Sequence, residues 1–416
     1  MLILLSDGAG LTSRQSATLL SRAGHRVEVL APDSFCLCRF TRHVRKVHRV
    51  PAYGADPFGW LEAATAIAER RGADLLLPTQ EQVAVLAAAA PHRFRTVVPG
   101  FAALAQVQDK LSAHATLARI GLPQPDAEIV YSSAALAAAG PLPAFVKTPI
   151  GTASLGVHRV ATRQELRELA RRLDADGAFR SGGVLVQQPV EGPLVMVQSV
   201  FADGRQVAFH ACERVAEGPN GGASRKRSLT LPEVREQTAV LGDALGWHGA
   251  LSADVILGPD GPKFTDINPR LVEPMNAFLS GTDLIRALMD IAFAAPAGRP
   301  RDGRPDVRTR QTLLGILGAA GDRSRRSDVI AELWHTMLRT GEDRGWTEEL
   351  TPLRYDPLAV VPGLIAAAAT VIHPAAWRHF TGGSVNAYSL TPEAWQQIVR
   401  DADRPRYRTV PARYPG

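Results

Sequence analysis

The N-terminal quarter of the chain alternates between short apolar runs and helical patterns, and this alternation restricts the fold more than any other feature of the sequence. Apolar runs predict buried strands at 2–5, 26–30, 74–77 and 96–99. Patterns typical of helices lie between them, at 13–23, 57–71 and 80–90. Strands that alternate with helices form an open parallel sheet. We therefore predict an α/β, Rossmann-like domain over residues 1–108.

A glycine-rich turn follows the first predicted strand and raises the question of a dinucleotide site. Gly8 and Gly10 match the first two glycines of the Gly-x-Gly-x-x-Gly pattern, and Asp33 follows the second strand, near the place of that pattern's acidic residue. Ser13 stands at the third glycine position, where helix and strand must approach closely. Because the pattern is incomplete, we do not predict a dinucleotide site here.

Composition indicates an ordinary globular protein of two or three domains. The chain has 416 residues, of which 45% are hydrophobic and 21% are charged. Its net charge of +6 is spread along the whole length, so we expect no nucleic-acid partner. The longest apolar run, 357–372, is interrupted by Pro362 and Gly363. It is shorter than the roughly 20 residues that span a bilayer, so it predicts a buried helix and no transmembrane segment.

Cysteine and lysine are both rare in this chain, so their positions are informative. The cysteines are Cys36, Cys38 and Cys212, which form no zinc-ligand pattern. Such sparse cysteines are typical of a reducing cytoplasm, where we expect the protein to be located. Only five of the 47 basic residues are lysines, and these are Lys46, Lys110, Lys147, Lys226 and Lys263. A compact, flexible charge of the kind that binds phosphate is one reason to retain lysine where arginine is so common.

Residues 254–268 form a predicted β-hairpin with polar side chains on one face. Asp266 and Asn268 share that face because they are two residues apart on a strand. Antiparallel pairing can bring Asp254 alongside them. Two carboxylates and an amide oxygen on one surface are ligands that Mg²⁺ takes together with nucleotide phosphates. Arg270 lies just beyond the strand, where it can neutralise an anion at the metal.

The segment Asp266-Ile267-Asn268-Pro269-Arg270 resembles the metal-binding signature of the ATP-grasp ligases, and the resemblance covers roughly residues 1–300. In that family an acidic residue and an Asn on one strand bind two Mg²⁺ ions, together with a second acid upstream. The resemblance therefore implies that Asp254, Asp266 and Asn268 bind the metal. It also implies that Arg270 is a catalytic residue that stabilises an acyl phosphate. The family usually has Glu where this chain has the shorter Asp266.

Two lysines and a glycine-rich loop resemble the phosphate-binding elements of the same family. Lys147 ends a predicted strand, and the loop that follows has the sequence Gly151-Thr152-Ala153-Ser154-Leu155-Gly156. The resemblance implies that Lys147 contacts the α- and β-phosphates of ATP. It further implies that backbone N–H groups of the loop, at Gly151, Ser154 and Gly156, close over the terminal phosphates. Lys110, at the start of a predicted helix, matches the second phosphate lysine.

The segment 184–192 resembles the hinge that holds adenine in this family. The resemblance implies that the carbonyl of Gln188 accepts a hydrogen bond from the adenine amine and that the N–H of Val190 donates to a ring nitrogen. The resemblance also implies that the Gln187 side chain adds a contact. Leu194 stands where the family usually has the acid that binds ribose, so Glu191 or a residue elsewhere would have to take that role.

The segment 210–226 resembles the surface beside the γ-phosphate and the acceptor. Here the resemblance implies that Arg214 is a second catalytic residue, which grips substrate carboxylate or the transferred phosphate. It implies that Lys226 is a further phosphate contact, although the glycine-rich loop before it is equally typical of a mobile connector. Glu81 lies at the carboxyl end of a predicted strand, where open sheets place ligand contacts, but we interpret it as a helix cap.

The remaining regions complete the predicted architecture. The α/β domain is followed by a two-lobed α+β ATP-grasp fold, with a lid subdomain at 109–188 and a central metal-binding subdomain at 189–300. After a linker at 299–310, a mostly helical extension occupies 301–416, with a frayed end over its last dozen residues. For this extension the sequence leaves three roles open, namely closing the active site, forming a homodimer or recruiting substrate.

The resemblance implies an ATP-dependent ligase that acts on small molecules. Such an enzyme activates a carboxylate as an acyl phosphate, couples it to an amine and releases ADP and phosphate. The implied cofactors are ATP and Mg²⁺, as two ions, with Mn²⁺ as a possible substitute. Carboxylation, phosphoryl transfer to another acceptor, and a non-catalytic nucleotide-binding regulator remain as other interpretations.

Overall fold

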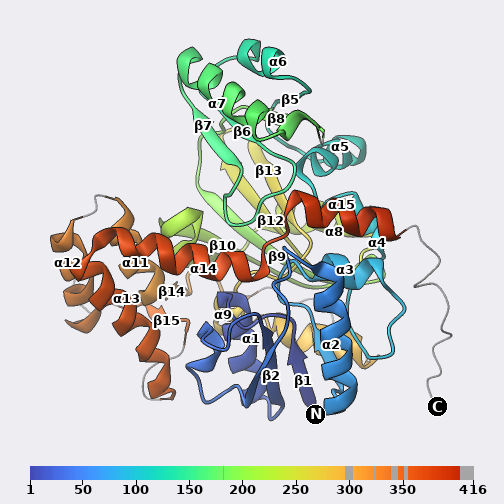
Figure 1. Ribbon diagram of the computed structural model, residues 1–416, viewed down its shortest axis with the longest axis vertical. Helices are drawn as coiled ribbons and strands as arrows, with labels where there is room; N and C mark the ends of the chain where they lie inside the picture. The colour runs from blue at the N-terminus through green and yellow to red at the C-terminus, as the bar shows by residue number, and fades with distance from the viewer. Residues whose placement is uncertain (181, 296–302, 323–324, 339–344, 351–354, 403–416) are drawn as a thin grey trace.

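A computed structural model describes residues 1–180, 182–295, 303–322, 325–338, 345–350 and 355–402 of the chain. The predicted frayed end lies in 403–416, outside the described residues. Figure 1 shows the N-terminal sheet at the bottom, a lid at the top, a long central sheet between them and a group of C-terminal helices on the left. This arrangement is the α/β architecture, with an N-terminal parallel sheet, a two-lobed body and a mostly helical extension, that the sequence predicts.

The N-terminal domain has a four-stranded parallel sheet in the order β3-β2-β1-β4. Its strands are β1 (Leu2–Leu5), β2 (Arg26–Ala31), β3 (Lys46–Arg49) and β4 (Leu75–Leu77). Its helices are α1 (Leu11–Arg22), α2 (Pro57–Arg71), α3 (Val83–Ala88) and α4 (Phe101–Ala105). The predicted βαβ pattern is confirmed, whereas the strand expected at 96–99 is wrong, because that segment is irregular. Gly10 lies close to the Gln80 side chain, whose amide nitrogen would be 2.4 Å from a Cβ at this position, so a larger residue here would have to displace that side chain.

The central sheet has the strand order β13-β12-β9-β10-β11-β14-β15 among the described residues. Its strands are β9 (Leu194–Ala202), β10 (Arg205–Glu217), β11 (Ala223–Leu229), β12 (Gly249–Gly258), β13 (Gly261–Asn268), β14 (Arg308–Arg310) and β15 (Thr347–Glu348). Helices α8 (Pro232–Leu245), α9 (Met275–Ser280) and α10 (Leu284–Ala292) accompany it. Strand β14 pairs with β11, so the described part of the predicted linker at 299–310 is in part a strand of this sheet.

The lid carries a four-stranded antiparallel sheet in the order β5-β8-β6-β7. Its strands are β5 (Ala127–Val130), β6 (Ala144–Lys147), β7 (Val157–Val160) and β8 (Val184–Gln187), and its helices are α5 (Lys110–Ile120), α6 (Ser133–Ala138) and α7 (Arg163–Ala175). Asp109 caps α5 by accepting hydrogen bonds from the N–H groups of Leu111 and Ser112. This cap fixes the start of α5, and with it the position of Lys110.

The C-terminal extension folds as the helices α11 (Thr312–Asp322), α12 (Arg326–Leu338), α13 (Val360–Ile372), α14 (Trp377–Tyr388) and α15 (Pro392–Ala402). The apolar run predicted as a buried helix becomes α13, but Leu364 is 59% exposed and Ile372 is 73% exposed, so one face of it is open to solvent. Among the described helices, none is long and apolar enough to cross a membrane. In Figure 1, α14 leads from the helical group toward the centre of the molecule and α15 lies beside the N-terminal domain.

The domains share continuous cores. One cluster of buried side chains contains Trp60 from α2, Val197 from β9, Leu245 from α8 and Ile398 from α15. It therefore joins the N-terminal domain, the central sheet and the last helix of the extension. Burial of apolar surface across these boundaries stabilises the relative positions of the elements that surround the site described below.

Candidate functional site

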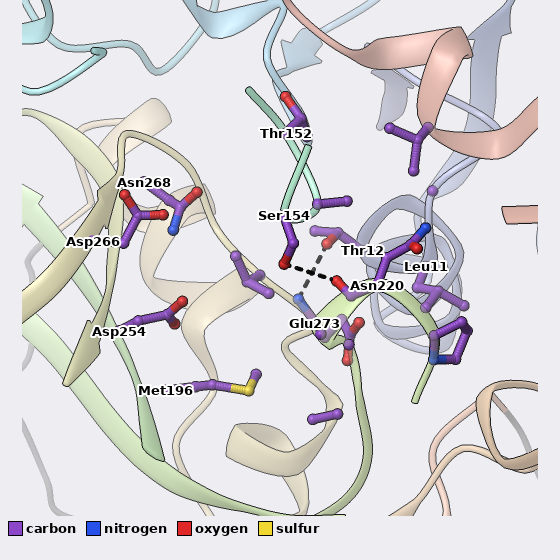
Figure 2. Close-up of a pocket in the computed structure, with 18 of the residues that line it drawn as sticks. Leu11, Thr12, Thr152, Ser154, Met196, Asn220, Asp254, Asp266, Asn268 and Glu273 are labelled. Carbon is purple, nitrogen blue, oxygen red and sulfur yellow. Dashed lines mark hydrogen bonds between the residues drawn. The ribbon is translucent and has the colours of Figure 1, made fainter. Parts of the chain in front are cut away.

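The hairpin β12–β13 brings the three predicted metal ligands together. Asp254 pairs directly with Asp266 across the hairpin, and Ser252 pairs with Asn268. The three side chains project to the same side of the sheet (Figure 2). The predicted antiparallel pairing of the hairpin is therefore confirmed.

The electrostatics of the hairpin favour a bound cation. Burial, followed by the facing Asp266 carboxylate, raises the pKa of Asp254 to about 6. Among the described residues, no group of three or more His, Cys, Asp or Glu side chains forms a metal site. Two carboxylates and the Asn268 amide oxygen thus make an incomplete oxygen shell, which suits Mg²⁺ that shares its coordination with phosphate oxygens and water.

Both predicted phosphate lysines reach the same cavity. Lys147, at the end of β6, is buried, and its ammonium donates a hydrogen bond to the Thr265 carbonyl at 2.8 Å. Burial lowers the pKa of Lys147, and the nearby Asp266 carboxylate opposes this effect. The Lys110 ammonium donates to the Gly151 carbonyl at 3.1 Å and so links α5 to the loop that follows β6.

The loop between β6 and β7 is tightly folded. Ala153 and Ser154 adopt positive φ angles of 53° and 62°, and Gly156 adopts +79°. Gly151 and Ser154 line the cavity, and the Ser154 hydroxyl donates a hydrogen bond to the Asn220 carbonyl at 3.0 Å (Figure 2). Gly156 does not line the cavity; a Cβ there would lie 2.0 Å from the Thr148 hydroxyl, so it shapes the loop from behind.

The predicted adenine hinge follows β8 and lines the cavity through Gln187, Gln188 and Val190. The Gln188 N–H donates to the Asp126 carbonyl at 2.8 Å. Within the described part of the chain, the Gln188 carbonyl and the Val190 N–H have no hydrogen-bond partner. These are the two backbone groups that the sequence predicts to bind adenine.

Glu191, which the sequence offers for the missing ribose ligand, does not reach the cavity. It is exposed. The acids that line it, among the described residues, are Asp254, Asp266 and Glu273.

The predicted catalytic arginines have different surroundings. Arg270 lines the cavity, and its Nε donates to the Glu81 carboxylate at 2.9 Å. Glu81 thus holds Arg270, and its expected role as a helix cap is wrong. Arg214 does not line the cavity, and its guanidinium is bonded to the Gly221 carbonyl at 2.8 Å and to Glu217 at 3.1 Å.

The structure places Lys226 away from this cavity. Its ammonium is fully buried and is bonded to the carboxylates of Glu273 and Glu349. Burial disfavours the charge, but the two carboxylates outweigh it and raise the pKa of Lys226. The predicted phosphate contact conflicts with this placement, in which Lys226 forms a structural ion cluster.

Hairpin, lysines, loop and hinge surround one cavity of about 570 Å³. Sequence reasoning missed several of its lining residues, namely Thr12, Gln80, Gln198, Glu273 and the side chains from α11, α13 and α14. The extension contains no recognisable chemical motif, so only the fold reveals that its helices reach the site.

The likeness to known proteins lies in part of one curated sequence and in the fold of solved structures. No protein-family model matches the chain. Over 224 residues the chain is 26% identical to carnosine synthase 1 of Gallus gallus, a stretch that covers 47% of this chain and 23% of the chicken protein. The chain thus spans about a quarter of the length of that curated relative.

Among the solved structures that resemble this chain, two cover about three quarters of its length. The biotin carboxylase of Campylobacter jejuni, solved as a complex with β-γ-ATP, superposes with a TM-score of 0.60 at 18% identity over 74% of each chain. The L-amino acid ligase of Bacillus licheniformis gives a TM-score of 0.54 at 16% identity, over 70% of this chain and 74% of the ligase. At such identities the likeness establishes the fold. The chain has the ATP-grasp fold that its sequence predicts.

Proposed function

We propose that the protein is an ATP-dependent ligase that activates a small-molecule carboxylate and couples it to an amine. The observation that carries this proposal is that one cavity is lined by Asp254, Asp266 and Asn268 together with Lys147 and Lys110. The Gln188 carbonyl and the Val190 N–H, which have no partner among the residues that the structure describes, support an adenine site at the same cavity.

We assign the metal to the hairpin. Asp254, Asp266 and Asn268 would hold Mg²⁺, as one or two ions, and Mn²⁺ has the same preference for oxygen ligands. When bound, the metal neutralises phosphate charge and polarises the terminal phosphoryl group. The raised pKa of Asp254 supports this assignment, because a cation offsets the cost of holding two facing carboxylates charged.

The chain contributes positioning and charge neutralisation to two steps. In the first, a carboxylate oxygen attacks the γ-phosphorus of ATP, and the bond from that phosphorus to the β-phosphate oxygen breaks to give an acyl phosphate and ADP. In the second, an amine attacks the acyl carbon, loses a proton and displaces phosphate. Lys147 and Lys110 hold the phosphates, and Arg270, held by Glu81, balances the charge that develops at the acyl group.

Two further observations support the cellular location and the second candidate chemistry that we propose. All three cysteines are free and buried, which supports the cytoplasmic location that we propose. The likeness to a biotin carboxylase favours carboxylation as the second candidate, since the fold hosts both kinds of protein.

The proposal is tested by measuring ADP release from Mg²⁺–ATP with pools of carboxylic acids and amino acids, followed by mass spectrometry of the products. We expect ADP only when an acid and an amine are both present, and a product that has lost one water relative to their sum. ADP formation that requires bicarbonate in place of an acid–amine pair would establish carboxylation. Bound ATP without ADP from any mixture would contradict both enzymatic candidates.

A further inference from the structure

The cavity has a second, apolar end that the nucleotide-binding residues do not explain. Its walls come from α11 and α14 of the extension and, in the N-terminal domain, from the segment after β2. The side chains concerned are Leu313, Leu317, Phe380, Val385, Leu37 and Phe40. Elements from opposite ends of the sequence thus contribute apolar side chains to one cavity. Such apolar walls favour apolar ligand groups, because removing apolar surface from water lowers the free energy.

The order of the central sheet places this end beyond the proposed metal site. Moving from the hairpin β13–β12, the next strands are β9, β10 and β11, and α11 packs against β11. The apolar end is therefore continuous with the hairpin but displaced from it across the sheet. A molecule that occupies both ends would place a polar group near the phosphates and an apolar group against the extension.

Gln198 lies on β9, between these two ends. It pairs with Ser252 on β12, which in turn pairs with Asn268, so the three residues form a row across neighbouring strands. Its side chain is fully buried and lines the cavity. Among the described residues, neither the amide oxygen nor the amide nitrogen of Gln198 has a hydrogen-bond partner. A buried amide without partners is costly, and a ligand with a donor or an acceptor would satisfy it.

We propose that this part of the cavity binds an amino acid with a large apolar side chain, which packs between the extension and the segment after β2 while Gln198 hydrogen-bonds its polar backbone group. The assignment of this ligand as a substrate rests on the ligase activity proposed above. An amide side chain both donates and accepts, so it suits either the carboxylate or the amino group of such a ligand. The shared chemistry is therefore an apolar amino acid, used either as the acid or as the amine.

Binding to the complete chain tests the proposal directly. Titration calorimetry in Mg²⁺ and a non-hydrolysable ATP analogue compares derivatives of phenylalanine and leucine with those of alanine and glutamate. N-acetyl amino acids retain only the carboxylate and amino-acid amides retain only the amine, so the two series distinguish the acid from the amine. In one of the two series, we expect the phenylalanine and leucine derivatives to bind at least about tenfold more tightly than the alanine and glutamate derivatives. Equal or tighter binding of the small and polar members, or no binding of any member, would overturn the proposal.

Two variants on α14 form a matched pair. Ser384 lines the cavity, so Ser384→Phe fills the apolar end, whereas Asn386 is exposed on the same helix, so Asn386→Phe adds the same ring outside. We expect Ser384→Phe to weaken binding of the phenylalanine derivative by about tenfold or more and Asn386→Phe to leave it unchanged. Equal effects of the two substitutions, or none from Ser384→Phe, would show that the ligand binds elsewhere.

Gln198→Leu separates ligand binding from folding. Because the amide has no partner among the described residues, its removal leaves the unfolding midpoint unchanged or higher, while apolar amino-acid derivatives bind at least about tenfold more weakly. Unchanged binding in this variant would contradict the role of Gln198. The outcomes also separate the two proposals: selective binding without ADP release refutes the ligase and leaves the pocket, whereas ADP release with only small polar substrates refutes the pocket and leaves the ligase.

Discussion

At the scale of single residues, His210 shows how strongly the interior of the central sheet constrains charge. It lies on β10, fully buried, and one ring nitrogen is hydrogen-bonded to the Asn276 amide oxygen at 2.9 Å. Burial lowers the pKa of His210 to about 4, against the weaker opposing effect of Asn276. The native protein therefore holds this imidazole neutral at pH values where an unfolded chain would protonate it.

His210 predicts a loss of stability in mild acid. Between its native pKa and the unfolded value of about 6.5, the unfolded chain binds more protons, so the free energy of unfolding falls as pH falls. The expected contribution is about 2 kcal/mol between pH 7 and pH 5, measured by urea unfolding at both values. The variant His210→Phe should lose this part of the pH dependence. An unchanged difference between the two pH values in that variant would assign it to other groups.

Single residues also show what the sequence can and cannot predict. Asp254 and Asp266 are predicted as neighbours, because a short hairpin fixes its own pairing. The surroundings of Lys226 could not be predicted, since its partner Glu349 is 123 positions away along the chain. The rarity of lysine indicates that Lys226 is important, but it does not indicate that its partners are the carboxylates of Glu273 and Glu349 and not a phosphate group.

At the scale of elements, the loop between β6 and β7 combines two kinds of constraint. Its backbone takes left-handed conformations at Ser154 and Gly156, and it is closed by the Thr148 N–H, which donates to the Gly156 carbonyl at 2.9 Å. Its composition predicts such a loop, because glycine tolerates positive φ. The contact of its tip with Asn220 depends on tertiary packing and is not visible in the sequence.

A comparison of Gly156→Ala with Gly121→Ala distinguishes the effect of a changed loop shape from the general cost of backbone strain. Both glycines have φ near +80°, so alanine costs each roughly 1–2 kcal/mol of stability. Only at Gly156 would the new Cβ also collide, at 2.0 Å from the Thr148 hydroxyl, whereas Gly121 has nothing within 4 Å. We expect ATP-analogue affinity, measured by calorimetry, to fall about tenfold or more in Gly156→Ala and to stay unchanged in Gly121→Ala. Equal affinities in the two variants would show that the loop is not part of the ATP site.

At the scale of the whole molecule, buried charges fasten the C-terminal extension to the rest of the chain. Asp356 accepts a hydrogen bond from the Arg14 guanidinium at 2.9 Å, and Glu349 is bonded to Gln15 at 2.9 Å and to Lys226 at 2.7 Å. The extension is thus anchored to the N-terminal domain and to the central sheet at once. The sequence of the extension predicts its helices. It does not predict these attachments, because it carries no motif and the partners are distant along the chain.

Lys226→Met tests this anchoring. The substitution keeps the length of the side chain but leaves Glu273 and Glu349 without their shared cation in a buried place, at a cost of about 3–5 kcal/mol in the free energy of unfolding. Lys263 is a suitable control, because it is half-buried on β13 and has no acidic partner among the described residues. Chemical unfolding should show a large loss for Lys226→Met and a change within about 0.5 kcal/mol for Lys263→Met. A similarly small change in Lys226→Met would mean that the ion cluster adds nothing to the attachment.

The central claim is that the β12–β13 hairpin binds Mg²⁺–ATP, and calorimetric titration of an ATP analogue tests it most directly. The double variant Asp266→Ala, Asn268→Ala removes two of the three ligands, while Asp260→Ala removes an exposed carboxylate from the turn of the same hairpin. We predict that Mg²⁺ strengthens binding to the unaltered protein and to Asp260→Ala, and that the double variant binds at least about a hundredfold more weakly, equivalent to about 2.7 kcal/mol. Undiminished, Mg²⁺-dependent binding in a folded double variant would contradict the account.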